Sequence, residues 1–166
     1  MVAISEFEND LMNKAKANKQ RIVLPEGDCE RVLKAADAAL KQEVADIIIL
    51  GNPATVQTKA TELGLDLSKA QIVDYLHAPE FEDYAITLAE LRKAKGLTLE
   101  EAREMMKDGA YYGTMMVYKG AADGMVSGAE HTTANTIRPA LQFVKTKPGA
   151  TMVSGAFLMC YNGQLQ

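Results

Sequence analysis

The stretch RIVLPEGDCERVLKAADAALKQEVADIIIL (Arg21–Leu50) decides the fold of this chain. It opens with a short apolar run that Pro-Glu-Gly stops, and it closes with ADIIIL (Ala45–Leu50), a nearly continuous β-branched run. Between the two runs, apolar residues recur at i, i+1, i+4, i+7 and i+8 from Val32, which is the spacing of one helical face. A continuous β-branched run is typical of a strand buried on both faces. The stretch therefore predicts a strand, a helix and a second, fully buried strand.

The same alternation continues toward the C-terminus. Asn52-Pro53 predicts the start of a helix with proline at its first position, where the missing N–H is tolerated. A weaker strand is expected at Gln71–Asp74, helices from Glu80 to Met116, a strand at Ala121–Val126 and a helix at Thr132–Val144. Strands separated by helices form parallel sheets that helices cover on both faces. The predicted fold class is therefore α/β, a three-layer sandwich with a mainly parallel sheet.

The composition of the 166 residues, 48% hydrophobic and 24% charged, is that of a soluble globular domain. The 18 Lys and Arg against 22 Asp and Glu give a net charge of −4, which lacks the basic footprint of a non-specific nucleic-acid binder. Cys29 and Cys160 form no CxxC pair, and only two histidines occur, so no disulfide framework or metal site is expected. No run approaches the ~20 apolar residues of a membrane span, and MVAISEFEND lacks the features of a secretory signal. We expect a cytoplasmic protein with neither a membrane nor a nucleic acid as partner.

The stretch DGMVSGAEHTTANTIRPALQ (Asp123–Gln142) carries the strongest chemical signal. A buried strand leads into a Ser-Gly-Ala turn, and a helix opens at Thr132 and Thr133. Free N–H groups at a helix N-terminus attract phosphate, and the two hydroxyls add donors. Arg138 lies six residues beyond Thr132, about 9 Å along the helix, and its side chain leans back toward the turn. The alternative is that Thr132 only caps the helix and Arg138 is a solvated surface charge. Neither a dinucleotide fingerprint nor a P-loop is present.

The second candidate residue is Arg92, because it continues an apolar stripe. It lies four residues after Leu88, seven after Ala85 and eleven after Phe81. A charge on the buried face at a helix end pairs with carboxylates or carbonyl groups, or lines a cleft. The alternative is a simple favourable charge at the C-terminus of the helix.

Three further residues are assigned no chemical function. A general base at His131 needs an orienting carboxylate, which Glu130 cannot supply by adjacency alone, so a capping or packing role is favoured. His77 lies in a loop without a partner in the sequence. Cys29 stands near a helix start, where the pKa of a thiol can fall, but a single Cys there is more often structural.

Four stretches together resemble the phosphate acetyl/butyryltransferase family, and within it the acetyl-transferring members. In chain order they are RIVLPEGDCERVLKAA (Arg21–Ala36), LRKAKGLTLEEA (Leu91–Ala102), SGAEHTTANTIRPALQ (Ser127–Gln142) and PGATMVSGAFLM (Pro148–Met159). The resemblance extends over essentially the whole chain up to about Met159. It implies a fold similar to that of isocitrate and isopropylmalate dehydrogenases, with two domains and a cleft between them.

The resemblance also implies an activity. The family transfers an acetyl group between coenzyme A and phosphate (acetyl-CoA + phosphate = CoA + acetyl phosphate), with coenzyme A as a substrate, no cofactor, no metal and no acyl-enzyme. Arg92 and Arg138 correspond to two cleft arginines that bind anionic groups of CoA or of the phosphoryl substrate, which reverses the surface-charge interpretation of both. Ser127, Thr132 and Thr133 lie in the matching turn and are weaker candidates. The implied partners are coenzyme A or acetyl-CoA, phosphate or acetyl phosphate, and a second copy in a homodimer.

The chain departs from the family in length, because members are about twice as long. We therefore expect an N-terminal portion, with residues 1–150 forming the first α/β domain and residues 151–166 starting the crossover to a second domain. The resemblance places the thiol-deprotonating aspartate, a serine and a further arginine in the other half. No catalytic residue is thus assigned here, and the chain alone is expected to be inactive, with an exposed apolar surface and an open sheet edge.

Three alternatives remain open at this point. One is a phosphate butyryltransferase, which differs in the size of its acyl pocket. Another is a non-catalytic fragment that binds CoA or phosphate. The third is a dehydrogenase-like domain of the same fold, which the lack of carboxylate clusters for a metal–hydroxyacid site disfavours.

Overall fold

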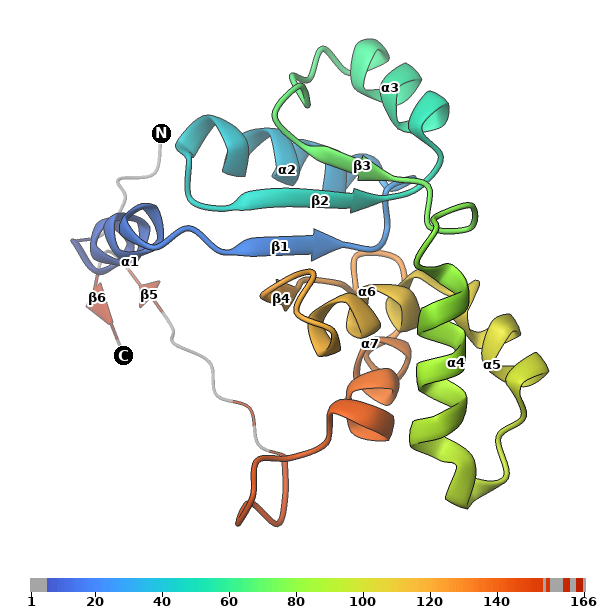
Figure 1. Ribbon diagram of the computed structural model, residues 1–166. Coiled ribbons are helices and arrows are strands. Elements are labelled where there is room, and N and C mark those ends of the chain that lie inside the picture. The colour runs from blue at the N-terminus through green and yellow to red at the C-terminus, as the bar shows by residue number, and fades with distance from the viewer. Residues whose placement is uncertain (1–5, 154, 156–159, 162–163, 166) are drawn as a thin grey trace.

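A four-stranded parallel sheet forms the centre of the computed structural model, which describes all residues except 1–5, 154, 156–159, 162–163 and 166 (Figure 1). The strand order is β3-β2-β1-β4. The strands are β1 (Arg21–Leu24), β2 (Asp46–Leu50), β3 (Gln71–Val73) and β4 (Gly124–Met125). Val23 of β1 is in register with Ile48 of β2 on one side. The four strands predicted between Arg21 and Val126 are present, and all their pairings are parallel. The strand expected within Ala150–Met159 falls partly on residues outside the described part of the chain.

One face of the sheet is covered by the two helices that connect its first three strands. These are α2 (Glu30–Gln42) and α3 (Pro53–Glu62), and the side chain of Asn52 accepts hydrogen bonds from the first N–H groups of α3. Ile47 and Ile49 of β2 point into this layer. The buried cluster on this face comprises Leu24, Leu33, Ala36, Leu40, Ile47, Ile49, Val56, Ala60 and Leu67.

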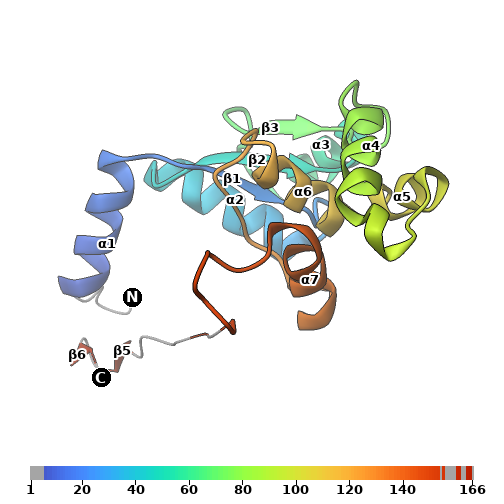
Figure 2. The ribbon, with the colours of Figure 1, turned by 60° about the horizontal axis from the view of Figure 1, so that its bottom comes forward.

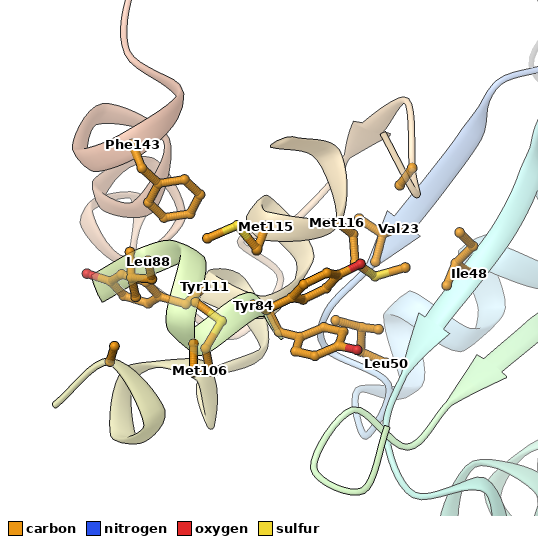
Figure 3. Close-up of a cluster of buried hydrophobic side chains, with 14 residues drawn as sticks. Val23, Ile48, Leu50, Tyr84, Leu88, Met106, Tyr111, Met115, Met116 and Phe143 are labelled. Carbon is orange, nitrogen blue, oxygen red and sulfur yellow. The ribbon is translucent and has the colours of Figure 1, made fainter. Parts of the chain in front are cut away.

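The opposite face is covered by α4 (Phe81–Arg92), α5 (Leu99–Met106) and α6 (Gly109–Tyr118). Figure 3 shows side chains of β1 and β2 pointing toward aromatic and methionine side chains of these helices. Ile48 and Leu50 are thus buried in the core on this face, whereas the alternate residues of β2 are buried in the core on the other face. The three-layer α/β fold predicted from the sequence is confirmed, because the β-branched run of β2 is buried on both sides as expected.

The last well-packed element is α7 (Thr133–Pro139), which passes into a π-helical turn, η2 (Ala140–Val144). The sequence predicts one continuous helix here. Pro139 has no N–H to donate to the preceding turn, and the helix widens directly after it. Phe143 of η2 is buried against Tyr111 and Tyr118, so α7 and η2 lie against α6.

The remaining elements are peripheral. The helix α1 (Glu6–Ala17) has no buried residue and stands away from the sheet in Figure 2. A 3₁₀ turn, η1 (Lys93–Lys95), follows α4, and β5 (Cys160–Tyr161) pairs with β6 (Gln164–Leu165) in an antiparallel ladder. The predicted crossover falls partly on residues outside the described part of the chain, so it stays a prediction. No helix of the described residues is both long and apolar enough to cross a membrane.

An apolar surface lies beside the edge strand β4, which pairs only with β1 among the described strands. Ile137, Leu141 and Val144 of α7 and η2 are exposed, and Val126 after β4 is 62% exposed. With α6 and β4, the first three line an apolar groove of about 410 Å³. Among the described residues, the exposed apolar surface and the unpaired edge of β4 expected from the sequence are both present.

Candidate functional site

Two helix ends meet at a cavity of about 440 Å³. The C-terminus of α4 contributes Arg92, and α7 with η2 contributes the other residues that line the cavity. They are Thr133, Ala134, Ile137, Arg138, Leu141 and Gln142. Two guanidinium groups are the charged groups of this lining, and no acid of the described part of the chain lines the cavity. A cavity whose charges are all cationic suits an anionic ligand.

Arg92 is held on the inner side of its helix. Its side chain is half-buried, and Nη1 donates a hydrogen bond to the backbone carbonyl of Gln142 over 3.3 Å. The hydroxyl of Tyr111 donates to the side-chain oxygen of the same glutamine over 3.1 Å. Burial raises the pKa of Tyr111, whereas the positive charges of Arg138 and Arg92 act in the opposite direction. The position of Arg92 on the apolar stripe of its helix predicted contact with another element, and the structure shows that contact with η2.

Arg138 is exposed on α7 and faces the cavity. Two of the other three arginines are neutralised: Arg21 pairs with Asp123 at 2.8 Å, and Arg103 pairs with two glutamates. The third, Arg31, donates to the backbone carbonyl of Ala129 and does not line this cavity. Within the described residues, neither Arg92 nor Arg138 has a carboxylate partner within 4 Å. Their charges are therefore available to a ligand.

The structure separates the three hydroxyl residues of the sequence prediction. Thr133 lines the cavity beside the arginines. Thr132 caps α7, since its hydroxyl accepts a hydrogen bond from the N–H of Asn135 over 3.3 Å. Ser127 lies outside the cavity lining, and its hydroxyl accepts a hydrogen bond from Thr136 over 3.4 Å. The cavity therefore joins Arg92, Arg138 and Thr133. The binding roles of all five residues stay predictions.

The turn before α7 corrects one expectation, because its N–H groups are not free. The N–H groups of Gly128 and Ala129 donate to Oε2 of Glu26, over 3.1 and 3.0 Å. Those of Glu130 and His131 donate to Oε1, over 2.9 and 3.0 Å. The four N–H groups of the turn are therefore not available to a phosphate, because a carboxylate of the protein itself accepts them. Phosphate binding at the first N–H groups of α7 stays a prediction.

Glu26 was missed in the sequence, and it also supplies the carboxylate that His131 lacked there. Its side chain is 1% exposed, and Oε1 lies 2.9 Å from Nδ1 of His131. Burial alone would raise the pKa of Glu26, but the hydrogen bonds from the turn and from His131 lower it to about 2. The available signal was the position of Glu26 directly after β1, since carboxyl ends of parallel strands converge at one edge of a sheet.

A second cavity, of about 370 Å³, opens at the carboxyl ends of the first three strands. Its charged lining is mostly acidic, with Lys107 and His131 as the basic residues. The acidic residues are Glu26, Asp28, Asp108 and Glu130. This lining disfavours phosphate, so the arginine cavity is the better candidate for an anionic substrate.

Fold and cavity together define an α/β domain with a cavity beside its sheet whose charged lining residues are two arginines. The family described as "Phosphate acetyl/butaryl transferase" matches residues 6–166. The chain belongs to this family, which confirms the resemblance inferred from the four sequence motifs.

Individual relatives agree with this assignment. The chain is 56% identical to the phosphate acetyltransferase of Nitratidesulfovibrio vulgaris over 93% of its own length and 22% of the relative's. It is 54% identical to that of Corynebacterium glutamicum, over 96% of the chain and 48% of the relative. A solved phosphotransacetylase from Streptococcus pyogenes superposes with a TM-score of 0.86 at 42% identity, covering 92% of this chain and 46% of that one. The chain thus spans less than half the length of these relatives.

Proposed function

We propose that this chain forms the anion-binding domain of an enzyme that transfers an acetyl group between coenzyme A and inorganic phosphate. The observation that carries the proposal is the pair of unneutralised arginines, Arg92 and Arg138, which line one cavity. The matched relatives are named phosphate acetyltransferases, which favours acetyl over butyryl as the transferred group.

The proposed reaction joins the thiol sulfur of CoA to the carbonyl carbon of acetyl phosphate and breaks the bond from that carbon to the phosphate oxygen. The thiol proton passes to a base, and phosphate leaves. Guanidinium groups keep their charge at all working pH values and meet phosphate oxygens with two parallel hydrogen bonds. Arg92 and Arg138 would hold the phosphate groups of CoA or the phosphoryl substrate, and Thr133 would add a hydroxyl. No residue of this chain is proposed as the base, and no metal or cofactor enters the proposal.

The resemblance to the family also supports a homodimeric assembly and a cytoplasmic location for the whole enzyme. Sedimentation of the purified protein measures the first, and fractionation of the cells that produce it measures the second.

Calorimetric titration of the chain with CoA tests the proposal directly. Arg138→Ala and Arg92→Ala should each weaken CoA binding about 10- to 150-fold, because a lost charge-assisted hydrogen bond is worth about 1.5–3 kcal/mol. Arg138→Lys should recover part of the affinity, since an ammonium keeps the charge but loses the planar fork. Pantetheine, which lacks the phosphates, should bind weakly and respond to neither substitution.

Arg103→Ala is the matched control, since it removes the same charge from a surface arginine paired with Glu82 and Glu100. It should leave CoA affinity within about twofold, with circular dichroism confirming the fold of every variant. Failure of the unaltered chain to bind CoA at millimolar concentration would overturn the proposal, as would equal binding by Arg138→Ala and Arg103→Ala.

A further inference from the structure

A buried carboxylate joins the segments that follow two neighbouring strands, β1 and β4. Glu26 lies two residues beyond the end of β1, and the turn of residues 128–131 follows β4 and precedes α7. Both carboxylate oxygens are used: each accepts two N–H groups of the turn, and Oε1 also lies within hydrogen-bond distance of the His131 ring. Four successive backbone donors on one side chain fix both the position and the orientation of the turn.

The same connection holds the turn from its other side. Arg31, in the first turn of α2, donates a hydrogen bond to the backbone carbonyl of Ala129. Glu26 therefore binds the N–H groups of the turn while Arg31 binds one of its carbonyl groups. Residues of the β1–α2 connection and of the first turn of α2 thus hydrogen-bond to the turn of residues 128–131, which leads into α7.

We infer that Glu26 is a positioning residue for the arginine cavity, because it sets where α7 starts and hence where Arg138 and Thr133 lie. The inference rests on the proposed function, and Glu26 itself does not line that cavity.

Helix geometry gives the size of the effect. Arg138 lies five residues beyond Thr133, the first residue of α7, which is about 7.5 Å along the helix. A rotation of about 8° at the start of α7 therefore displaces the Cα of Arg138 by about 1 Å. A misplacement of about 1 Å at a binding group costs up to about 100-fold in function. A small loosening of the turn is thus enough to separate Arg138 from the position it takes beside Arg92.

Glu26→Gln tests the inference sharply, because it retains the shape of the side chain. One of the two oxygens becomes an amide nitrogen, so two backbone N–H donors then face a donor instead of an acceptor. Asp37→Asn is a matched control. Asp37 is another buried carboxylate, which accepts the N–H of Asp66 over 3.1 Å and pairs with Lys41, on the opposite face of the sheet.

The experiment measures CoA affinity by calorimetry and the backbone amide resonances by NMR, well below the melting temperature of each variant. Glu26→Gln should weaken CoA binding at least about tenfold and shift the amide resonances of Thr133 and Arg138 before any CoA is added. Asp37→Asn should leave CoA affinity within about twofold and those resonances unmoved. A purely stabilising role of Glu26 predicts that the two variants behave alike in both measurements.

The two readouts also separate this inference from the proposed function. If the unaltered chain binds no CoA, the proposed function fails, while the resonances of Thr133 and Arg138 still report on positioning. Unmoved resonances in Glu26→Gln overturn the inference whether or not CoA binds.

Should Glu26→Gln not fold, Arg31→Ala and His131→Ala each remove one contact of the turn. They should shift the same resonances and weaken CoA binding about two- to fivefold, and no change in either variant would overturn the inference.

Discussion

Acid should destabilise the chain through Glu26 by an amount that the structure allows us to work out. The pKa of Glu26 falls from the ordinary value of 4.5 to about 2, because four N–H groups and the His131 ring outweigh the cost of burial. At about 1.4 kcal/mol per pH unit, the ionised carboxylate contributes about 3 kcal/mol to the free energy of unfolding. Because the folded pKa is the lower one, this stabilisation is complete above about pH 5 and is lost as the pH falls toward 2.

Urea unfolding of the unaltered chain and of Glu26→Gln at pH 7, 5, 4 and 3 measures this contribution. The difference in unfolding free energy between the two proteins should be constant from pH 7 to 5 and should shrink by about 2 kcal/mol at pH 3. Asp123, whose hydrogen bonds to Arg21 lower its pKa to about 2, titrates in both proteins and cancels in the difference. Parallel pH profiles for the two proteins would refute the reasoning, since Glu26 would then carry no depressed pKa.

Two other outcomes follow from the residues described above. The 166-residue chain alone should show no acetyl transfer above background in a coupled assay of CoA release, because no base for the thiol is assigned to it; turnover within tenfold of a full-length relative would contradict that division of labour. Gly109→Ala should lower the midpoint of thermal unfolding and cost about 1–3 kcal/mol, because a Cβ there would lie 2.8 Å from the backbone oxygen of Pro25. An unchanged melting temperature would show that the backbone of α6 moves away freely.

The architecture could be predicted because its signals are local. The β-branched run of Ala45–Leu50 shows burial on both faces without reference to any other segment, and the structure divides its side chains between two cores. The spacing from Phe81 to Arg92 likewise places the guanidinium on the packed side of α4. Both inferences rest on the spacing of apolar residues within a single strand or helix. The buried faces that this spacing predicts are the faces that pack in the structure.

The turn before α7 could not be predicted in the same way. Its donors are satisfied by Glu26, a residue 102 to 105 positions earlier in the chain. Nothing in the local sequence distinguishes a turn with free N–H groups from one that an internal carboxylate has already filled. Long-range hydrogen bonds of this kind depend on strand order, and the adjacency of β1 and β4 is known only from the fold.

The strand order β3-β2-β1-β4 places the buried carboxylate of Glu26 at a particular point of the sheet. The chain leaves β1 toward α2 on one face and leaves β4 toward α7 on the other, so a topological switch point lies between these strands. In open α/β sheets, such a crevice is the usual place for a ligand. Here Glu26 acts as a built-in ligand in one part of the crevice, as an external carboxylate would, and the acidic cavity of about 370 Å³ lies beside it. This part of the crevice has become a structural joint, and the anion site that we propose lies instead at the arginines of α4 and α7.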